Sequence, residues 1–240
     1  MRIRQAFVPE AGHQLISADW SQVELRVLAH FCADPLLVEA FSLNLDIHKR
    51  TASQLFAVTV EEVTAAQREV AKTVNFATIY GQGASALGQI LDIPRKTAQE
   101  YIENYFKAYA HVRQWLDRTI AEAHRDGYVS TLFGRRRYIP ELSSRNPVER
   151  QAGERIAANT PIQGTAADLC KMAMINIARR LQGLQARIVL QIHDELVLES
   201  PQAEVEQVSQ IVRYEMENVH PLAVPLLVNL GVGKSWAEAH

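Results

Sequence analysis

The sequence predicts an α+β fold in which strands at both ends of the chain enclose a long helical block. Apolar and polar residues alternate in HQLISAD (residues 13–19), which predicts a strand that ends on an acid. From residue 21 to about residue 128 the spacing of apolar residues is helical. Strand patterns return at 189–199 and 224–233. We therefore expect the two ends of the chain to share one antiparallel sheet.

Capping patterns place the predicted helices. Ser21 and Glu24 are spaced as a capping box before SQVELRVLAHF, and Thr64 and Gln67 form a second possible box. Gly81 fits a C-terminal stop, so AAQREVAKTVNFATIY is expected to be one helix. The remaining elements are expected in this order: helices over PRKTAQEYIENYFKAY and VRQWLDRTIAEAHRDG, a hairpin at 128–140, a long helix interrupted at Pro161 and ending near Gly183, an amphipathic helix with Val205, Val208, Ile211 and Val212 on one side, and a final strand at 224–233.

Composition limits the protein class only broadly. The chain has 240 residues, of which 48% are hydrophobic, enough for one or two packed domains. The net charge of −2 gives no global signal for nucleic acid, although basic residues cluster in HKR, PRK and GRRRY. Cys32 and Cys170 lack metal-ligand spacing and indicate a reducing compartment. No apolar run reaches the length of a membrane span, so we expect a cytoplasmic protein.

Two acids end strands that are far apart in the sequence. Asp19 closes the first strand, and Asp194 lies in the hairpin turn of VLQIHDELVLE. If the terminal strands pair, both carboxylates reach one edge of the sheet. Such a pair needs a cation or a shared proton, and Mg²⁺ binds through one or two carboxylates plus substrate phosphates. An ordinary strand end and a solvated turn explain the same residues, and spacing alone favours neither interpretation.

A row of side chains follows one side of the helix that contains residue 72. Arg68, Lys72, Phe76 and Tyr80 recur every four residues, and the ends of the row are about 18 Å apart. The basic end could hold the phosphates of a nucleoside triphosphate, and the aromatic end could stack on its sugar and base. A generic amphipathic helix, with aromatic residues in the core and cations in water, shows this pattern more often.

A third row straddles Pro161. Arg155, Asn159 and Gln163 again recur every four residues. Amide side chains both donate and accept hydrogen bonds, and the minor groove of DNA presents acceptors at every base pair. These side chains could therefore hold DNA of any sequence. Alternatively, they cap and repair the helix around Pro161, where freed carbonyl groups need partners.

Three motifs in a fixed order carry a family resemblance. SADWSQVELRVLAH resembles motif A of the family A DNA polymerases, REVAKTVNFATIYG resembles motif B, and QIHDELVLE resembles motif C. The stretches DIHKRTA, TLFGRRRYIPEL, ERIAANTPIQGTAAD and GKSWAEAH are similar as well. The resemblance covers essentially the whole chain, most closely the C-terminal part of the bacterial members. It implies a right-hand polymerase with palm at 1–35 and 146–240, fingers at 36–145, and no thumb in this chain.

The resemblance also implies a role for individual residues in the palm. Asp19 and Asp194 would be catalytic ligands of two Mg²⁺ ions, with the backbone carbonyl of Trp20 as a further ligand. The family usually has Tyr at the position of Trp20, a change that a carbonyl ligand tolerates. Glu195 would be a nearby catalytic acid of less certain role, and His193 would contact the primer terminus.

Nucleotide and DNA contacts are implied in the same way. Arg68, Lys72 and His48 would hold the triphosphate, and Phe76 and Tyr80 would flank sugar and base. Glu24 would lie under the sugar and exclude a 2′-hydroxyl, which favours deoxynucleotides and is compatible with its capping role. The residues that would face the primer–template are Arg155, Asn159 and Gln163.

The implied activity is DNA-directed DNA synthesis in replication or repair. Deoxynucleotides would be added to a primer 3′-hydroxyl by two-metal nucleotidyl transfer, with release of pyrophosphate. The expected partners are primer–template DNA and deoxynucleoside triphosphates, with no membrane and no obligate protein partner, at the bacterial nucleoid. Because the chain begins just before motif A, the alternative is a truncated fragment, or a DNA- or nucleotide-binding module, with little activity alone.

Overall fold

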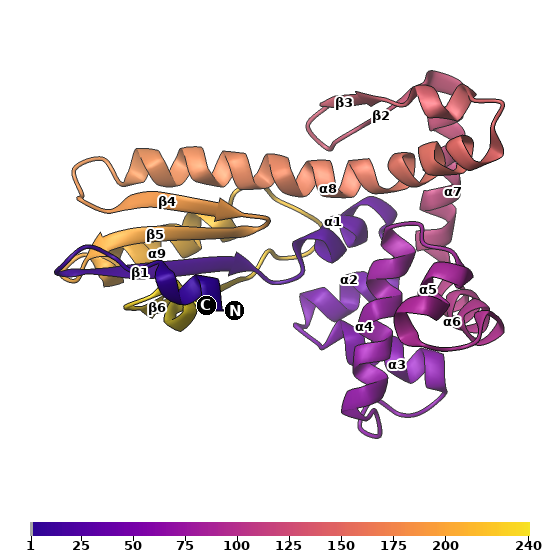
Figure 1. Cartoon of the computed structure of the whole chain (residues 1–240), viewed down its shortest axis with the longest axis horizontal. Helices are drawn as coiled ribbons and strands as arrows, with labels where there is room; N and C mark the ends of the chain where they lie inside the picture. The colour runs from indigo at the N-terminus through magenta and orange to yellow at the C-terminus, as the bar shows by residue number, and fades with distance from the viewer. Residues whose placement is uncertain (1) are drawn as a thin grey trace. The chain divides into compact units, whose positions relative to one another are not determined.

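The computed structural model describes residues 2–240, and the chain divides into two compact units (Figure 1). The sheet unit comprises the residues up to Arg26 together with those from Ala166 onward. The helical unit comprises Val27–Thr165. One contiguous helical segment is therefore inserted between two halves of a sheet-containing unit, as the α+β prediction requires. The palm and finger boundaries expected from the sequence stay a prediction.

The sheet unit is built around its first strand. Its strands are β1 (His13–Trp20), β4 (Arg187–Ile192), β5 (Glu195–Pro201) and β6 (Val228–Gly233). They lie in the order β4-β5-β1-β6, and each neighbouring pair is antiparallel. This confirms that the two ends of the chain share one sheet. The last strand begins at Val228 rather than at residue 224, because Pro225 has no N–H to donate to a ladder and its carbonyl instead accepts from Arg26 Nη1.

Helices cover both faces of this sheet. Side chains alternate between the faces of a strand, and Trp20 on β1 donates from its indole to the carbonyl of Met216 in α9 (Val205–Glu217). On the opposite face, Leu15 and Val197 pack against Trp236 of the short helix α10 (Trp236–Ala239). Near the chain start, the 3₁₀ helix η1 (Arg2–Ala6) also contacts α10.

Helix ends in the helical unit follow the local sequence. The helices are α1 (Val23–Cys32, which begins in the sheet unit), α2 (Pro35–Ser42), α3 (Ile47–Phe56), α4 (Ala65–Ile79), α5 (Ala84–Leu91), α6 (Arg95–Ala108), α7 (Ala110–Asp126) and α8 (Pro147–Arg180). Thr64 and Gln67 form the predicted capping box of α4. Gly81 follows the helix with φ +62°, a conformation that glycine adopts without strain.

Two sequence predictions need correction here. Helix α1 begins at Val23, after Gln22 with φ +53°, so Ser21 does not occupy the N-cap position that a Ser21–Glu24 box requires. Helix α8 continues through Pro161 instead of being interrupted. Carbonyl groups near Pro161 accept hydrogen bonds from side chains, because Arg135 donates to the carbonyl of Gly164 and Thr160 donates to that of Ile156.

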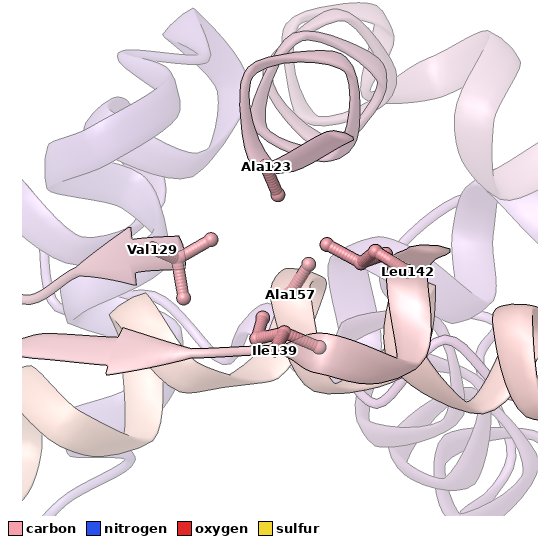
Figure 2. Packing of buried hydrophobic residues seen from close by; sticks show 5 residues of the cluster. All are labelled: Ala123, Val129, Ile139, Leu142 and Ala157. Carbon is pink, nitrogen blue, oxygen red and sulfur yellow. The ribbon is translucent and has the colours of Figure 1, made fainter. Parts of the chain in front are cut away.

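A small apolar cluster joins several segments of the helical unit. Figure 2 shows Ala123 of α7, Val129 of β2 (Tyr128–Ser130) and Ala157 of α8 converging with Ile139 and Leu142. Leu142 belongs to the 3₁₀ helix η2 (Pro140–Ser143), which follows β3 (Arg136–Tyr138). The predicted hairpin β2–β3 is thereby fixed between α7 and α8.

Candidate active site

Three acids meet at one end of the central strands of the sheet unit. Asp19 near the end of β1 lies directly opposite Glu195 at the start of β5. Asp194 occupies the turn between β4 and β5, because Ile192 pairs with Glu195 and leaves only His193 and Asp194 between them. Like charges placed directly across a ladder repel. Each carboxylate must therefore find a partner, keep a proton or bind a cation.

The Asp19 carboxylate has one buried oxygen, Oδ1, that makes no hydrogen bond. Burial raises the pKa of Asp19 to about 6, with further increases from the charges of Asp194 and Glu195 that outweigh the opposing charges of His240 and Arg4. Burial and Glu195 also raise the pKa of Asp194. Two adjacent acids that resist ionisation fit a hard divalent cation, which favours carboxylate oxygens.

No cage of protein ligands surrounds these acids. Among the residues that the structure describes, no group of three or more His, Cys, Asp or Glu side chains is arranged to hold a metal. Mg²⁺ typically keeps several waters and uses only one or two carboxylates plus substrate phosphates. The donor set therefore fits Mg²⁺ held jointly with a phosphate-bearing substrate.

Glu195 has the opposite environment. Only 4% of the residue is exposed, and its Oε1 accepts from Ser17 Oγ at 2.6 Å and from Trp236 Nε1 at 2.6 Å. His240 Nδ1 lies 3.3 Å from the same oxygen, and Arg4 Nη2 lies 3.6 Å from Oε2. Although burial opposes the effect, these hydrogen bonds lower the pKa of Glu195. Its carboxylate therefore joins the acids to α10 and η1.

The other palm residues lie close to the acids along the chain. Trp20 is buried with its indole bound to α9, so only its backbone remains for a metal. His193 is exposed at the hairpin tip with φ +55°, a strained conformation for a residue with a side chain. Glu24 is half-buried in the first turn of α1.

The basic and aromatic row lies along one side of α4, within the helical unit. Lys72 is exposed, and Arg68, Phe76 and Tyr80 are half-buried. The rings of Phe76 and Tyr80 stack with centroids 6.2 Å apart. The aromatic residues are therefore not core residues of a generic amphipathic helix. Phe76 and Tyr80 form an accessible surface next to the cationic side chains of Arg68 and Lys72 on the same side of the helix.

Asp46 orients the basic end of this row. Its Oδ1 caps α3 by accepting from the backbone N–H groups of His48 and Lys49, and its Oδ2 accepts from Arg68 Nε at 2.7 Å. Asp46 thereby holds the Arg68 guanidinium at the start of α3. Despite partial burial, the bond to Arg68 lowers the pKa of Asp46.

His48 lies beside the aromatic end of the row but inside the protein. Its ring centroid is 6.1 Å from that of Phe76, and 2% of the residue is exposed. Its Nδ1 lies 2.9 Å from Asn75 Nδ2. Asn75 in turn accepts from Thr51 Oγ1 at 3.0 Å, and Tyr109 continues this buried chain.

The row on α8 meets the C-terminal end of α4. Asn159 Nδ2 lies 3.5 Å from the carbonyl oxygen of Tyr80, a long hydrogen bond. A methyl group at Gly81 would lie 3.2 Å from Arg155 Cγ. Arg155 and Gln163 are exposed. Because Asn159 reaches across to α4, repair of the helix around Pro161 does not account for its position.

Sequence reasoning missed the residues that surround Glu195 and His48. Trp236 and His240 lie within GKSWAEAH, and Asn75 lies within REVAKTVNFATIYG, but none was identified as part of a site. A buried asparagine within an apolar helix face was the available signal for Asn75, since buried amides need partners. No local pattern indicates that Trp236 reaches Glu195.

The sequence of this chain is similar to those of known proteins. A sequence model described as DNA polymerase family A matches residues 1–238. The thermostable DNA polymerase I of Thermus aquaticus is 50% identical over 238 residues, and the DNA polymerase I of Pseudomonas aeruginosa is 49% identical over 241 residues. These matches cover 99% and 100% of this chain but only 29% and 26% of the relatives. The chain thus spans less than a third of their length.

A solved structure has the same fold. The polymerase domain of Pol1 from M. smegmatis, determined as a complex with DNA primer-template and dNTP, superposes with a TM-score of 0.95 at 45% identity. The superposition covers 99% of this chain and 42% of that one. Together with the whole-length sequence match, it shows that this chain belongs to DNA polymerase family A.

Proposed function

We propose that this chain carries the active site of a DNA-directed DNA polymerase. Its substrates would be a primer–template and deoxynucleoside triphosphates, and its setting bacterial DNA replication or repair in the cytoplasm. The observation that carries the proposal is the half-buried Asp19 carboxylate beside Asp194, whose buried Oδ1 has no hydrogen bond, in a chain of this family. Two neighbouring carboxylates repel each other unless a cation lies between them. Such a pair is expected at a site that binds a phosphate group through a metal ion.

The reaction is nucleotidyl transfer. The primer 3′-hydroxyl oxygen bonds to the α-phosphorus, the bond to the bridging oxygen breaks, and pyrophosphate leaves with that electron pair. Two Mg²⁺ ions, when bound by Asp19, Asp194 and the Trp20 carbonyl, would lower the pKa of the 3′-hydroxyl and neutralise the leaving phosphates. Arg68 and Lys72 would bind the triphosphate, and Phe76 and Tyr80 would stack on sugar and base.

Contacts with DNA come from side chains that carry no sequence preference. Arg155, Asn159 and Gln163 would face the duplex, and His193 would contact the primer terminus. Arg155 and Gln163 are exposed, and the amides suit the acceptors that every base pair presents in the minor groove. Such contacts would hold any template sequence.

The test replaces the matching segment of the Thermus aquaticus polymerase with this chain, because the chain spans only part of that relative. We expect the chimera to extend a labelled primer in Mg²⁺. Asp19→Asn and Asp194→Asn should each reduce the rate by at least about 10²-fold, since each removes charge stabilisation of the reaction. Near-normal extension by either folded variant at low Mg²⁺ would exclude that residue as a metal ligand.

The alternative is a DNA- or nucleotide-binding module without chemistry. The presence of both acids favours the enzyme, because a binding module has no use for a buried carboxylate oxygen that lacks a hydrogen bond. A folded chimera that binds primer–template but never extends it, at any Mg²⁺ concentration, would support the alternative.

A further inference from the structure

A buried hydrogen-bonded chain leads from α7 to the candidate nucleotide site on α3 and α4. Tyr109, at the start of α7, places its hydroxyl 3.0 Å from Thr51 Oγ1, and Thr51 donates to Asn75 Oδ1 at 3.0 Å. Asn75 Nδ2 then lies 2.9 Å from His48 Nδ1. All of these residues are at most 2% exposed. The chain has two possible directions of donation, because an asparagine amide can be turned over.

The hydroxyl of Tyr109 decides between these directions. Burial raises the pKa of Tyr109, so the hydroxyl keeps its proton and must donate it. Thr51 Oγ1 is its partner among the described hydrogen bonds. Thr51 therefore accepts from Tyr109 and gives its own proton to Asn75 Oδ1. The opposite direction would leave the buried Tyr109 proton unpaired, at a cost of about 1–3 kcal/mol.

This direction fixes the state of the histidine. With its oxygen turned toward Thr51, the Asn75 amide presents an N–H group to His48 Nδ1. That nitrogen must accept, so the single ring proton lies on Nε2.

We infer that Asn75 is a positioning residue that holds His48 as the neutral imidazole protonated on Nε2, so that the ring offers the nucleotide one fixed N–H donor and no charge. The contact between His48 and the nucleotide rests on the proposed function, whereas the tautomer does not. Arg68 and Lys72 would attract the triphosphate by their charge, and the N–H group of His48 would orient it.

The charged groups around His48 are consistent with a neutral ring. Burial lowers the pKa of His48 to about 4. Asp46 on α3 and Glu69 on α4 raise the pKa, whereas Arg68 and Lys72 on α4 lower it. The cations that would attract phosphate therefore also oppose a charge on the histidine.

The first experiment needs no enzymatic activity. Long-range ¹H–¹⁵N NMR of the ¹⁵N-labelled chain distinguishes the two neutral tautomers from the imidazolium, and His48→Gln assigns the His48 signals. We expect the Nε2–H tautomer from pH 8 to pH 5.5 with no titration. A signal of the Nδ1–H tautomer, or of the charged ring at pH 7, would overturn the inference whatever the protein catalyses.

Asn75 and its neighbours provide matched variants. Asn75→Asp replaces the donor by an acceptor and should move the ring proton to Nδ1 and raise the pKa of His48 by at least one unit. Thr51→Val removes the bond that fixes the direction of the amide but leaves Asn75 beside Nδ1, so the Nδ1–H tautomer should appear alongside the Nε2–H form. An unchanged tautomer in a folded Asn75→Asp chain would show that Asn75 does not set it.

The second experiment connects the tautomer to the nucleotide. In the chimera, His48→Gln preserves a neutral N–H near the position of Nε2 and should keep KM for deoxynucleotides within about threefold, whereas His48→Leu should raise KM about tenfold. Both variants should keep the wild-type dependence of KM on salt. Weaker salt dependence in His48→Gln would reveal a lost charge and refute the neutral donor.

Discussion

The acids of the sheet unit and the polar residues of the helical unit are stabilised in opposite ways. Asp19 is half-buried, and its buried Oδ1 has no hydrogen bond and lies beside two further acids. His48, Asn75 and Thr51 are fully buried, but each has a protein partner. An organic ligand is best bound by donors that are already oriented. A metal ion needs oxygens that make no other hydrogen bond. The difference is therefore expected if the sheet unit binds a metal ion and the helical unit binds an organic ligand.

Glu195 and Asp19 should give the largest contrast, because they lie opposite each other across one ladder. Glu195→Ala leaves the donors on Ser17 and Trp236 unpaired and should lower the free energy of unfolding by about 2–4 kcal/mol. Asp19→Asn removes a repelled charge and should leave stability unchanged or raise it by up to about 1 kcal/mol. Urea unfolding followed by circular dichroism measures both. Equal destabilisation by the two substitutions would contradict the contrast.

Divalent cations should act on the sheet unit alone. Binding to the native state stabilises it by mass action, so we expect 10 mM Mg²⁺ to raise Tm of the chain by about 1–3 °C. The acid pair should be required, so Asp194→Asn should abolish the shift, and Glu199→Gln serves as a control acid on strand β5, which follows the turn that contains Asp194. EDTA should reverse the shift. A shift that survives Asp194→Asn would place the ion elsewhere.

His48 should make the stability of the helical unit depend on pH. Its pKa falls from 6.5 to about 4 on folding, so the unfolded chain binds the proton more readily. The resulting stabilisation is complete above about pH 6.5 and is lost as pH falls toward about 4. His48→Gln should flatten this part of the Tm profile. An identical profile in the variant would assign the pH dependence to other groups.

Asp46 should separate helix capping from orientation of Arg68. Asn caps helices about as well as Asp, so Asp46→Asn should change stability by less than about 1 kcal/mol. The Arg68 guanidinium loses one of its two anionic partners and keeps only Glu69, and KM for deoxynucleotides in the chimera should change severalfold. Asp46→Ala, which removes the cap as well, should cost about 1 kcal/mol more than Asp46→Asn. Equal KM values for wild type and Asp46→Asn would leave Asp46 with capping only.

Glu24 should have the smallest effect on folding. Ser21 does not occupy the N-cap position of α1, so Glu24→Ala removes no capping box, and we expect a stability change within about 0.5 kcal/mol. In the chimera the variant should raise the use of ribonucleotides relative to deoxynucleotides, because the shorter side chain leaves room for a 2′-hydroxyl. An unchanged ratio of the two kcat/KM values would remove Glu24 from sugar selection.

Sequence patterns predicted the local elements and the fold class well. The strand before Asp19, the capping box at Thr64 and the hairpin around Asp194 follow from alternation and turn chemistry, which act over a few residues. Helix continuity through Pro161 was missed, because the side chains that donate to carbonyl groups near this proline include Arg135 from another segment. The predicted start of α1 was too early, because Gln22 has a positive φ. The residue types at this position do not predict that conformation.

Partners within the sites were harder to predict than the site residues themselves. The spacing of Arg68, Lys72, Phe76 and Tyr80 is periodic along one helix and is visible in the sequence. The contacts of Glu195 with Trp236 and of Asn75 with His48 join separate elements. Such contacts depend on tertiary packing, which one sequence does not encode in any local period. Within the described residues, no helix has the length and apolar character to cross a membrane.

The position of β1 in the sheet has a consequence for the order of folding. Both neighbours of β1, namely β5 and β6, are synthesised only after the entire helical unit has been synthesised. The helical unit is contiguous and rich in local contacts, which favours early and rapid folding. During translation β1 must therefore wait with two open edges, which are aggregation-prone. We expect nascent chains that end before β5 to depend on chaperones far more than completed chains do.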